Sequence, residues 1–198
     1  MLFRSDLADA STPIDPQAIF DYLYFHCIPS PRTIYKGVYR LPPGQTATLQ
    51  NGQLHVTPQW VPKFDELCNP SFDALKAEFR QLLQESVAAQ LDGSKAACFL
   101  SGGTDSSTVA GMVRLASGQV THSYSIGFDA QGYDEMEYAR LASRHFKTEH
   151  HEYYVTPEDL VRSIADVAAS FDQPFGNSSV LPSYYCAKMA VDDGVTKI

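Results

Sequence analysis

Residues 96–113 read AACFLSGGTDSSTVAGMV and are the most informative part of the chain about its architecture. Its first five residues are apolar and compatible with a β-strand, and from about Ser106 apolar residues recur at helical spacing. Ser101, Gly102 and Gly103 therefore form a turn between a strand and a helix. The glycines let a bulky anion approach the backbone, while the helix offers unpaired N–H groups and its positive dipole end. The turn therefore predicts a phosphate site.

Asp105 lies inside this predicted anion site, where its charge would repel phosphate unless a divalent cation lies between them. We therefore predict that Asp105 is a Mg²⁺ ligand and that the hydroxyls of Ser101 and Ser106 are further donors. A flexible Ser/Gly turn capped by Asp105 is the alternative explanation. The strand before the turn and the apolar-faced helix after it favour the phosphate site.

Composition excludes several classes of partner. The chain has 198 residues and a net charge of -8, and it contains no cluster of Lys and Arg, which argues against a nucleic-acid or anionic-membrane surface. Its length accommodates one α/β domain, or one domain and a fragment of another. Neither a secretory leader nor a long apolar span is found, so we expect a cytoplasmic protein. The four scattered cysteines form no C-x-x-C pair, so we expect reduced, mostly buried thiols.

The first 62 residues read differently from the remainder. A helix is expected at residues 16–25, and two short strands at 47–50 and 53–57 are joined by Asn51-Gly52, a strong hairpin signal. Prolines between residues 58 and 70 then mark a linker. A second unit is expected to start there.

In the second unit, strands and helices alternate. Residues 71–91 predict an amphipathic helix with one apolar face. The elements expected after it are a strand at 96–100, a helix from 106, a strand at 120–128, a helix opened by Asp134 with Glu137 at capping-box spacing, a strand at 149–155, a helix starting at Thr156-Pro157, a helix at 180–191, and a strand beginning within 194–198. This order predicts an α/β fold, Rossmann-like, with a parallel sheet flanked by helices. Ligands of such sheets bind at the carboxyl ends of the strands, where the turn at residues 101–103 falls.

The tract S-G-G-x-D-S resembles the pyrophosphate loop (PP-loop) of the N-type ATP pyrophosphatases, which split ATP between its α and β phosphates. No Walker A sequence occurs in the chain. Several tracts are similar, in order and spacing, to the asparagine synthetase family of glutamine-dependent amidotransferases: FLSGGTDSS at 99–107, SYSIGF at 123–128, EHHEYYV at 149–155 and DQPFGNSSVLPSYY at 172–185. The resemblance implies an adenine nucleotide alpha hydrolase-like fold for the second unit.

The segment at residues 20–44 resembles the closing part of the family's glutaminase domain. The resemblance thus implies that residues 1–62 are the C-terminal remnant of a glutamine amidotransferase domain of the Ntn type, a small β-containing piece. Residues 63–198 would then be the N-terminal part of the ATP-binding synthetase domain.

The resemblance also implies the ligands and the reaction. ATP and Mg²⁺ would bind across the loop, and an asparagine synthase (glutamine-hydrolysing) type of ligase would activate a carboxylate such as aspartate as an acyl-adenylate. Pyrophosphate is released in that step, and ammonia then displaces AMP. The positions that match the family's site are Leu100 and Ile126 for the backbone that holds adenosine, Ser101, Gly102, Gly103, Asp105 and Ser106 for the pyrophosphate cradle, and Asp105 for the metal. No catalytic residue is assigned. The implied partners are small molecules, with a homo-oligomer left open.

The chain departs from the family pattern at both ends. The family's glutaminase has a cysteine directly after the initiator methionine, whereas this chain begins Met1-Leu2-Phe3-Arg4, so we expect no glutamine hydrolysis. It also stops at Ile198, before the family's S/A-G-D/E-G-x-D-E tract and its helical half. A truncated, internal piece of an amidotransferase is therefore expected, with apolar side chains of the first 62 residues exposed.

Three alternatives stay open. The sequence PFGN at residues 174–177 differs from the PFAD-like form of typical asparagine makers, and the architecture also resembles β-lactam synthetases and amidotransferases of surface-polymer pathways. A non-catalytic nucleotide-binding or interaction fragment is the alternative from another class. A tRNA-modifying pyrophosphatase is disfavoured because it would need a basic face.

His145, His150 and His151 lie close together in sequence and suggest a metal site. Adjacent residues of a strand point to opposite faces, so His150 and His151 could not readily bind one ion, and structural roles are favoured.

Acidic residues follow the strand at 120–128. Asp129, Asp134 and Glu135 could steer a substrate amine or Mg²⁺. Helix capping explains Asp134 without any ligand, and this interpretation is favoured.

Overall fold

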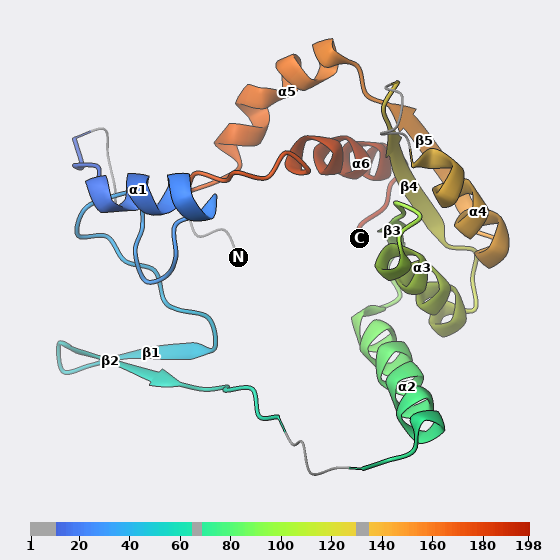
Figure 1. Ribbon diagram of the computed structural model, residues 1–198, viewed down its shortest axis with the longest axis horizontal. Coiled ribbons are helices and arrows are strands. Elements are labelled where there is room, and N and C mark those ends of the chain that lie inside the picture. The colour runs from blue at the N-terminus through green and yellow to red at the C-terminus, as the bar shows by residue number, and fades with distance from the viewer. Residues whose placement is uncertain (1–10, 65–68, 130–134) are drawn as a thin grey trace. The chain divides into compact units, whose positions relative to one another are not determined.

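The computed structural model describes residues 11–64, 69–129 and 135–198, and Figure 1 shows their secondary structure. The chain divides into two compact units. One contains the described residues of Met1–Cys68 together with Ala168–Ser178, and the other contains Asn69–Val167 and Ser179–Ile198. Within the described parts of the chain, no helix combines the length and apolar character needed to cross a membrane.

The first unit contains one helix and one hairpin before residue 64. Its elements are α1 (Pro16–Phe25), β1 (Gln45–Gln50) and β2 (Gln53–Pro58). Asp15 caps α1, because its side chain accepts a hydrogen bond from the Gln17 backbone N–H at 3.0 Å. Asn51 and Gly52 both have positive φ, 50° and 77°, as a two-residue hairpin turn of type I′ requires. The predicted helix and hairpin are therefore confirmed.

The segment Ala168–Ser178 completes the first unit. The Gly176 N–H donates to the His26 carbonyl at 3.0 Å, and the Gln173 side-chain oxygen accepts from the Ile34 N–H at 2.8 Å. A Cβ on Gly176 would lie 2.8 Å from the His26 Cβ, so only glycine allows this approach. The division of the chain into residues 1–62 and 63–198 by family domain stays a prediction.

The second unit is an α/β structure. Its elements, apart from the last two residues of α5, are α2 (Phe72–Gln90), β3 (Ala97–Phe99), α3 (Thr104–Ser117), β4 (His122–Gly127), α4 (Met136–Phe146), β5 (Glu149–Tyr154), α5 (Pro157–Ala169) and α6 (Val180–Asp192). Strands β3, β4 and β5 form a parallel sheet in that order, and a parallel bridge between Ala96 and Lys197 pairs the C-terminal residues with the start of β3. The predicted fold class, a parallel sheet flanked by helices, is confirmed.

Helices cover both faces of this sheet (Figure 1). On the α6 face the buried cluster consists of Ala97, Tyr124, Cys186, Ala190 and Val195. On the face covered by α3 and α4 it consists of Cys98, Leu100, Ala110, Met136 and Ala139. The strands supply both clusters because alternate side chains point to opposite faces. The core therefore has two layers, one on each side of the sheet.

Strand β4 carries buried serines on the α3–α4 face. Ser123 and Ser125 are almost fully buried. The Ser123 hydroxyl lies 2.7 Å from the Thr148 hydroxyl and 2.8 Å from His150 Nδ1, and the Ser125 hydroxyl donates to the Leu100 carbonyl. These bonds allow a polar strand sequence in the core, since a buried hydroxyl with a partner costs little.

Three described cysteines are free thiols. Cys98 and Cys186 are buried, and desolvation raises the pKa of each thiol to about 12, whereas Cys27 is exposed. Cys68 lies outside the described residues.

Two helices differ from expectation. The apolar face predicted for α2 exists, but no residue of this helix is buried, and Leu75, Phe79 and Leu82 are 49%, 63% and 54% exposed. Helix α4 begins at Met136 with Glu135 at its N-cap, and Asp134, the predicted cap, lies outside the described residues.

Candidate functional site

The turn at residues 101–103 lies at the carboxyl end of β3, beside β4. Leu100 is 1% exposed, its N–H donates to the Tyr124 carbonyl at 2.9 Å, and its carbonyl accepts from the Ser125 hydroxyl. These bonds fix the backbone where the strand ends and the turn begins. Because Phe99 pairs with Tyr124, Ile126 lies at the same edge of the sheet as Leu100. The structure thus brings these two predicted site residues together.

Two serine hydroxyls close the turn. The Oγ atoms of Ser101 and Ser106 are 2.9 Å apart, and the Ser101 N–H donates to the Ser106 Oγ at 3.2 Å. The Gly103 N–H donates to the Ser101 Oγ at 3.3 Å, and the Ser106 hydroxyl donates to the Gly103 carbonyl at 3.3 Å. Three of the predicted cradle residues, Ser101, Gly103 and Ser106, therefore form one hydrogen-bonded ring, whose hydroxyls are able to rotate toward an anion.

The two glycines of the turn have different environments. Gly102 has φ +81°, and a Cβ there would lie 2.5 Å from both the Ala139 N and the Tyr138 Cβ of helix α4. Gly103 has φ -70°, and a Cβ there would meet only the Ser101 Oγ, at 3.3 Å. Gly102 therefore permits close packing against α4, whereas Gly103 leaves the surface of the turn open.

Helix α3 starts at Thr104, two residues before the predicted start, with Gly103 as N-cap. Its first regular bond runs from the Ser107 N–H to the Gly103 carbonyl at 3.1 Å. The N–H groups of a first turn have no intrahelical acceptor, and they lie at the positive end of the helix dipole. The turn therefore presents donors and positive potential on its exposed side.

Asp105 lies in this first turn and is exposed. A carboxylate in the first turn is stabilised by the helix dipole without any ion. The same placement puts carboxylate oxygens next to the open side of the turn, where a hard divalent cation would find a ligand. Of the other acidic candidates, Asp129 and Glu135 are exposed beyond the end of β4, and the Glu135 carbonyl accepts from the Tyr138 and Ala139 N–H groups.

The predicted histidine cluster is divided by the sheet. The Nδ1 of His150 lies 2.8 Å from the Ser123 hydroxyl on the α3–α4 face, and desolvation lowers the pKa of His150. His151 points to the α6 face, where its ring stacks on Tyr124. His145 contacts the ring of Phe146 edge-on within α4. The prediction that His150 and His151 lie on opposite faces is confirmed.

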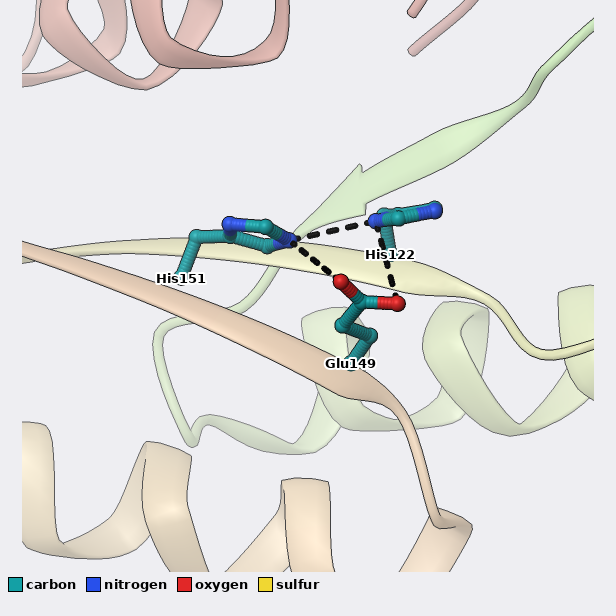
Figure 2. A group of neighbouring side chains, drawn as sticks. All are labelled: His122, Glu149 and His151. Carbon is teal, nitrogen blue, oxygen red and sulfur yellow. Dashed lines mark hydrogen bonds and ion pairs between the residues drawn. The ribbon is translucent and has the colours of Figure 1, made fainter. Parts of the chain in front are cut away.

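A second group of side chains forms at the other end of the sheet (Figure 2). His151 Nε2 lies 3.1 Å from His122 Nδ1, and the Glu149 carboxylate lies 3.8 Å from the first and 3.9 Å from the second. His122 and Glu149 are not among the site residues predicted from the sequence. They come together because they are partners in the register of β4 and β5, which the sequence does not show directly.

Comparisons with known proteins show which family the chain is similar to. A family model described as asparagine synthase matches residues 78–198. The chain is similar to putative asparagine synthetase (glutamine-hydrolyzing) 2 of Methanocaldococcus jannaschii, with 32% identity over 89% of this chain and 35% of that protein. It is also similar to asparagine synthetase (glutamine-hydrolyzing) 1 of Bacillus subtilis, with 25% identity over 93% of this chain and 29% of that protein.

Two further similarities concern other enzymes. Carboxyethyl-arginine beta-lactam-synthase of Streptomyces clavuligerus is 30% identical over 65% of this chain and 25% of that protein. Among solved structures, an NH3-dependent NAD synthetase from Campylobacter jejuni matches with 15% identity and a TM-score of 0.39, over 65% of this chain and 56% of that one. The chain spans about a third of the length of the curated relatives that it matches.

Proposed function

Because the chain belongs to the asparagine synthase family, we propose that residues 101–106 bind ATP in an ATP-dependent, amide-forming ligase. The observation that carries this proposal is the loop itself. Two mutually bonded hydroxyls, the open surface at Gly103 and the N-terminus of α3 meet at the carboxyl end of β3. That edge is where parallel α/β sheets bind nucleotides.

The loop suits a leaving pyrophosphate in particular. The hydroxyls of Ser101 and Ser106 are bonded to each other in the structure. Each would give up a bond within the loop for one to a phosphate oxygen, whose extra charge makes the new bond stronger. Donors that the loop places beside the leaving phosphates favour the transition state, because negative charge grows on the β and γ phosphates as they leave. Leu100 and Ile126 would hold adenosine through their backbones at the adjoining strand ends.

Magnesium would be held by Asp105. The donor set fits, since an exposed carboxylate beside a phosphate site supplies the oxygen ligand that Mg²⁺ prefers. Bound there, the ion would neutralise phosphate charge. Without such an ion, Asp105 would weaken anion binding at this helix end by repulsion.

The reaction proposed for the whole protein is the activation of a carboxylate as an acyl-adenylate, with release of pyrophosphate and attack by ammonia. Aspartate is the first candidate acceptor, because the family model is described as asparagine synthase and several relatives carry the name asparagine synthetase. The second candidate is an acceptor of the β-lactam synthetase class. It is favoured by the 30% identity to carboxyethyl-arginine beta-lactam-synthase.

ATP binding is tested by calorimetric titration of the purified chain, with and without Mg²⁺. We expect saturable, magnesium-dependent binding that Asp105→Asn weakens at least tenfold. Asp73→Asn is the matched control, because Asp73 is also an acidic residue in the first turn of a helix, but of α2. Equal ATP affinities of Asp105→Asn and Asp73→Asn would contradict the metal assignment. A folded chain without saturable ATP binding would contradict a nucleotide site in these residues.

The acceptor is tested by pyrophosphate release. Aspartate with ammonia is compared with carboxyethyl-arginine, each at a fixed ATP and Mg²⁺ concentration. Release that depends on aspartate and ammonia supports the first candidate, and release with carboxyethyl-arginine alone supports the second.

A further inference from the structure

We propose that His122, Glu149 and His151 form a binding site for a divalent first-row transition metal ion such as Zn²⁺. The three side chains project from the starts of β4 and β5 toward one point (Figure 2). One ligand atom from each lies within 4.8 Å of the other two. Two imidazole nitrogens and one carboxylate oxygen form a donor set that suits zinc and leaves one position open.

The spacing of the donor atoms is close to that of a metal centre. With metal–ligand bonds of about 2.1 Å, a tetrahedral site places neighbouring ligand atoms about 3.4 Å apart. The two nitrogens of His122 and His151 are 3.1 Å apart, which is close to this spacing. One Glu149 oxygen lies 3.8 Å from the His151 nitrogen, the other lies 3.9 Å from the His122 nitrogen, and a single oxygen lies within 4.8 Å of both. A small rotation of Glu149, which is 59% exposed, would close the site.

Contacts from the end of α6 orient one of the ligands. His151 Nδ1 lies 3.2 Å from the Asp193 carboxylate, and the Tyr124 hydroxyl donates to that carboxylate at 2.8 Å. A carboxylate at Nδ1 holds the hydrogen on that nitrogen, so the Nε2 lone pair points toward His122 and Glu149. The Tyr124 ring, fully buried, stacks on His151 at 4.7 Å. A carboxylate behind a histidine is the arrangement that orients metal-binding imidazoles.

A simple hydrogen bond is the competing explanation of the short contact. His122 Nδ1–H could donate to His151 Nε2 with no ion present. That bond does not involve Glu149, whose two oxygens approach the same two nitrogens, one each. A metal ion would use all three groups without loss of a proton, because the His122 hydrogen would move from Nδ1 to Nε2 and leave the Nδ1 lone pair free for the ion.

This site is separate from the proposed ATP loop. His122 begins β4, three residues before Ser125, which contacts Leu100 at the opposite end of the strands. Three residues of strand span about 10 Å. An ion here would link the starts of β4 and β5 and, through Asp193, the end of α6. The inference concerns structure and metal binding, and it does not depend on the proposed function.

The test is a calorimetric titration of the chelator-treated full chain with ZnCl₂ and, separately, with MgCl₂. The titrated chain carries Cys27→Ser, because Cys27 is an exposed thiol and thiols are themselves zinc ligands. We expect one Zn²⁺ per chain, no comparable Mg²⁺ binding, and a rise in the melting temperature on adding zinc. His122→Gln and Glu149→Gln should each lower zinc affinity at least tenfold. Asp193→Asn should lower it about 10- to 100-fold by loosening His151.

His145→Gln is the matched control, since His145 is exposed on α4 and touches none of these groups. It should leave zinc affinity unchanged. Glu149→Gln keeps the test valid if the histidine variants fail to fold, because its side chain is exposed and its shape is retained. Zinc affinity unchanged by Glu149→Gln, or a folded parent chain that binds no equivalent of zinc, overturns the proposal.

Discussion

Replacing Gly102 with alanine should destabilise the second unit more than replacing Gly103, the other glycine of the turn, with alanine. Gly102 has φ +81°, a region that costs an L-residue about 1–2 kcal/mol. The added Cβ would lie 2.5 Å from the Ala139 N and 2.6 Å from the Tyr138 carbonyl carbon. No rotamer change removes a clash with backbone, so an overpacking cost of about 1–3 kcal/mol is added.

The expected total loss is therefore about 2–5 kcal/mol, which is a large part of a typical stability of 5–15 kcal/mol. Gly118→Ala separates the two causes. Gly118 has φ +65° at the end of α3, and a Cβ there would meet nothing within 4 Å, so this variant carries the backbone strain alone. Gly103→Ala lacks the backbone strain, because φ is -70° at this position, and its Cβ would meet no backbone atom.

The assay is urea unfolding followed by circular dichroism at 222 nm. Tryptophan fluorescence is less suitable, because Trp60, the single tryptophan, belongs to the first unit and is 69% exposed. We expect the free energy of unfolding to be highest for Gly103→Ala, intermediate for Gly118→Ala and lowest for Gly102→Ala. If Gly102→Ala and Gly118→Ala lost the same stability within about 0.5 kcal/mol, the packing of α4 on the loop would be refuted.

Two further predictions use the same unfolding assay. Thr156 lies directly before α5, and its hydroxyl accepts from the Asp159 N–H at 3.2 Å. Thr156→Ala should therefore cost about 1 kcal/mol, whereas Thr156→Ser should cost little, and equal losses in the two variants would count against the cap. Burial lowers the pKa of His150 in the folded chain, so the unfolded chain binds more protons below about pH 6.5 and stability falls as the pH falls. His150→Asn should therefore show a shallower loss of stability between pH 7.5 and pH 5.5 than the parent, and an identical pH dependence would refute this.

Local sequence signals predicted the elements well. Helix α1 has the predicted bounds, and the hairpin has the predicted turn, because Pro16 and Asn51-Gly52 restrict the backbone through their own covalent structure. The cap of α5 by Thr156 is of the same kind. In each case the residues that determine the conformation are neighbours in the chain.

Features that depend on distant neighbours could not be predicted. The spacing of Leu75, Phe79 and Leu82 indicates an apolar face of α2, but not whether anything covers it, and these residues are exposed. The role of Gly102 depends on the approach of α4, about 35 residues later in the chain. The pairing of His122 with Glu149 depends on strand register.

The residues of the candidate ATP site could be predicted in part from the sequence. The motif at residues 101–106 shows that Ser101 and Ser106 are close in sequence, and the structure gives the bonds between their hydroxyls. Whether these residues bind ATP, and whether Asp105 binds magnesium, stay predictions that the titrations above test. The motif predicts where the loop lies, because a strand followed by glycines and a helix has few ways to fold.

The glycine of the sequence PFGN, at residue 176, has a packing cause that bears on the choice of acceptor. Gly176 donates to the His26 carbonyl, and a Cβ at this position would lie 2.8 Å from the His26 Cβ. His26 itself is held at φ 58° as the residue that ends α1. Glycine at residue 176 is therefore required by contacts within the first unit. Gly176 is then no evidence for a different acceptor, and Asn177 is the remaining difference from a PFAD-like sequence. The aspartate reaction should therefore be assayed first.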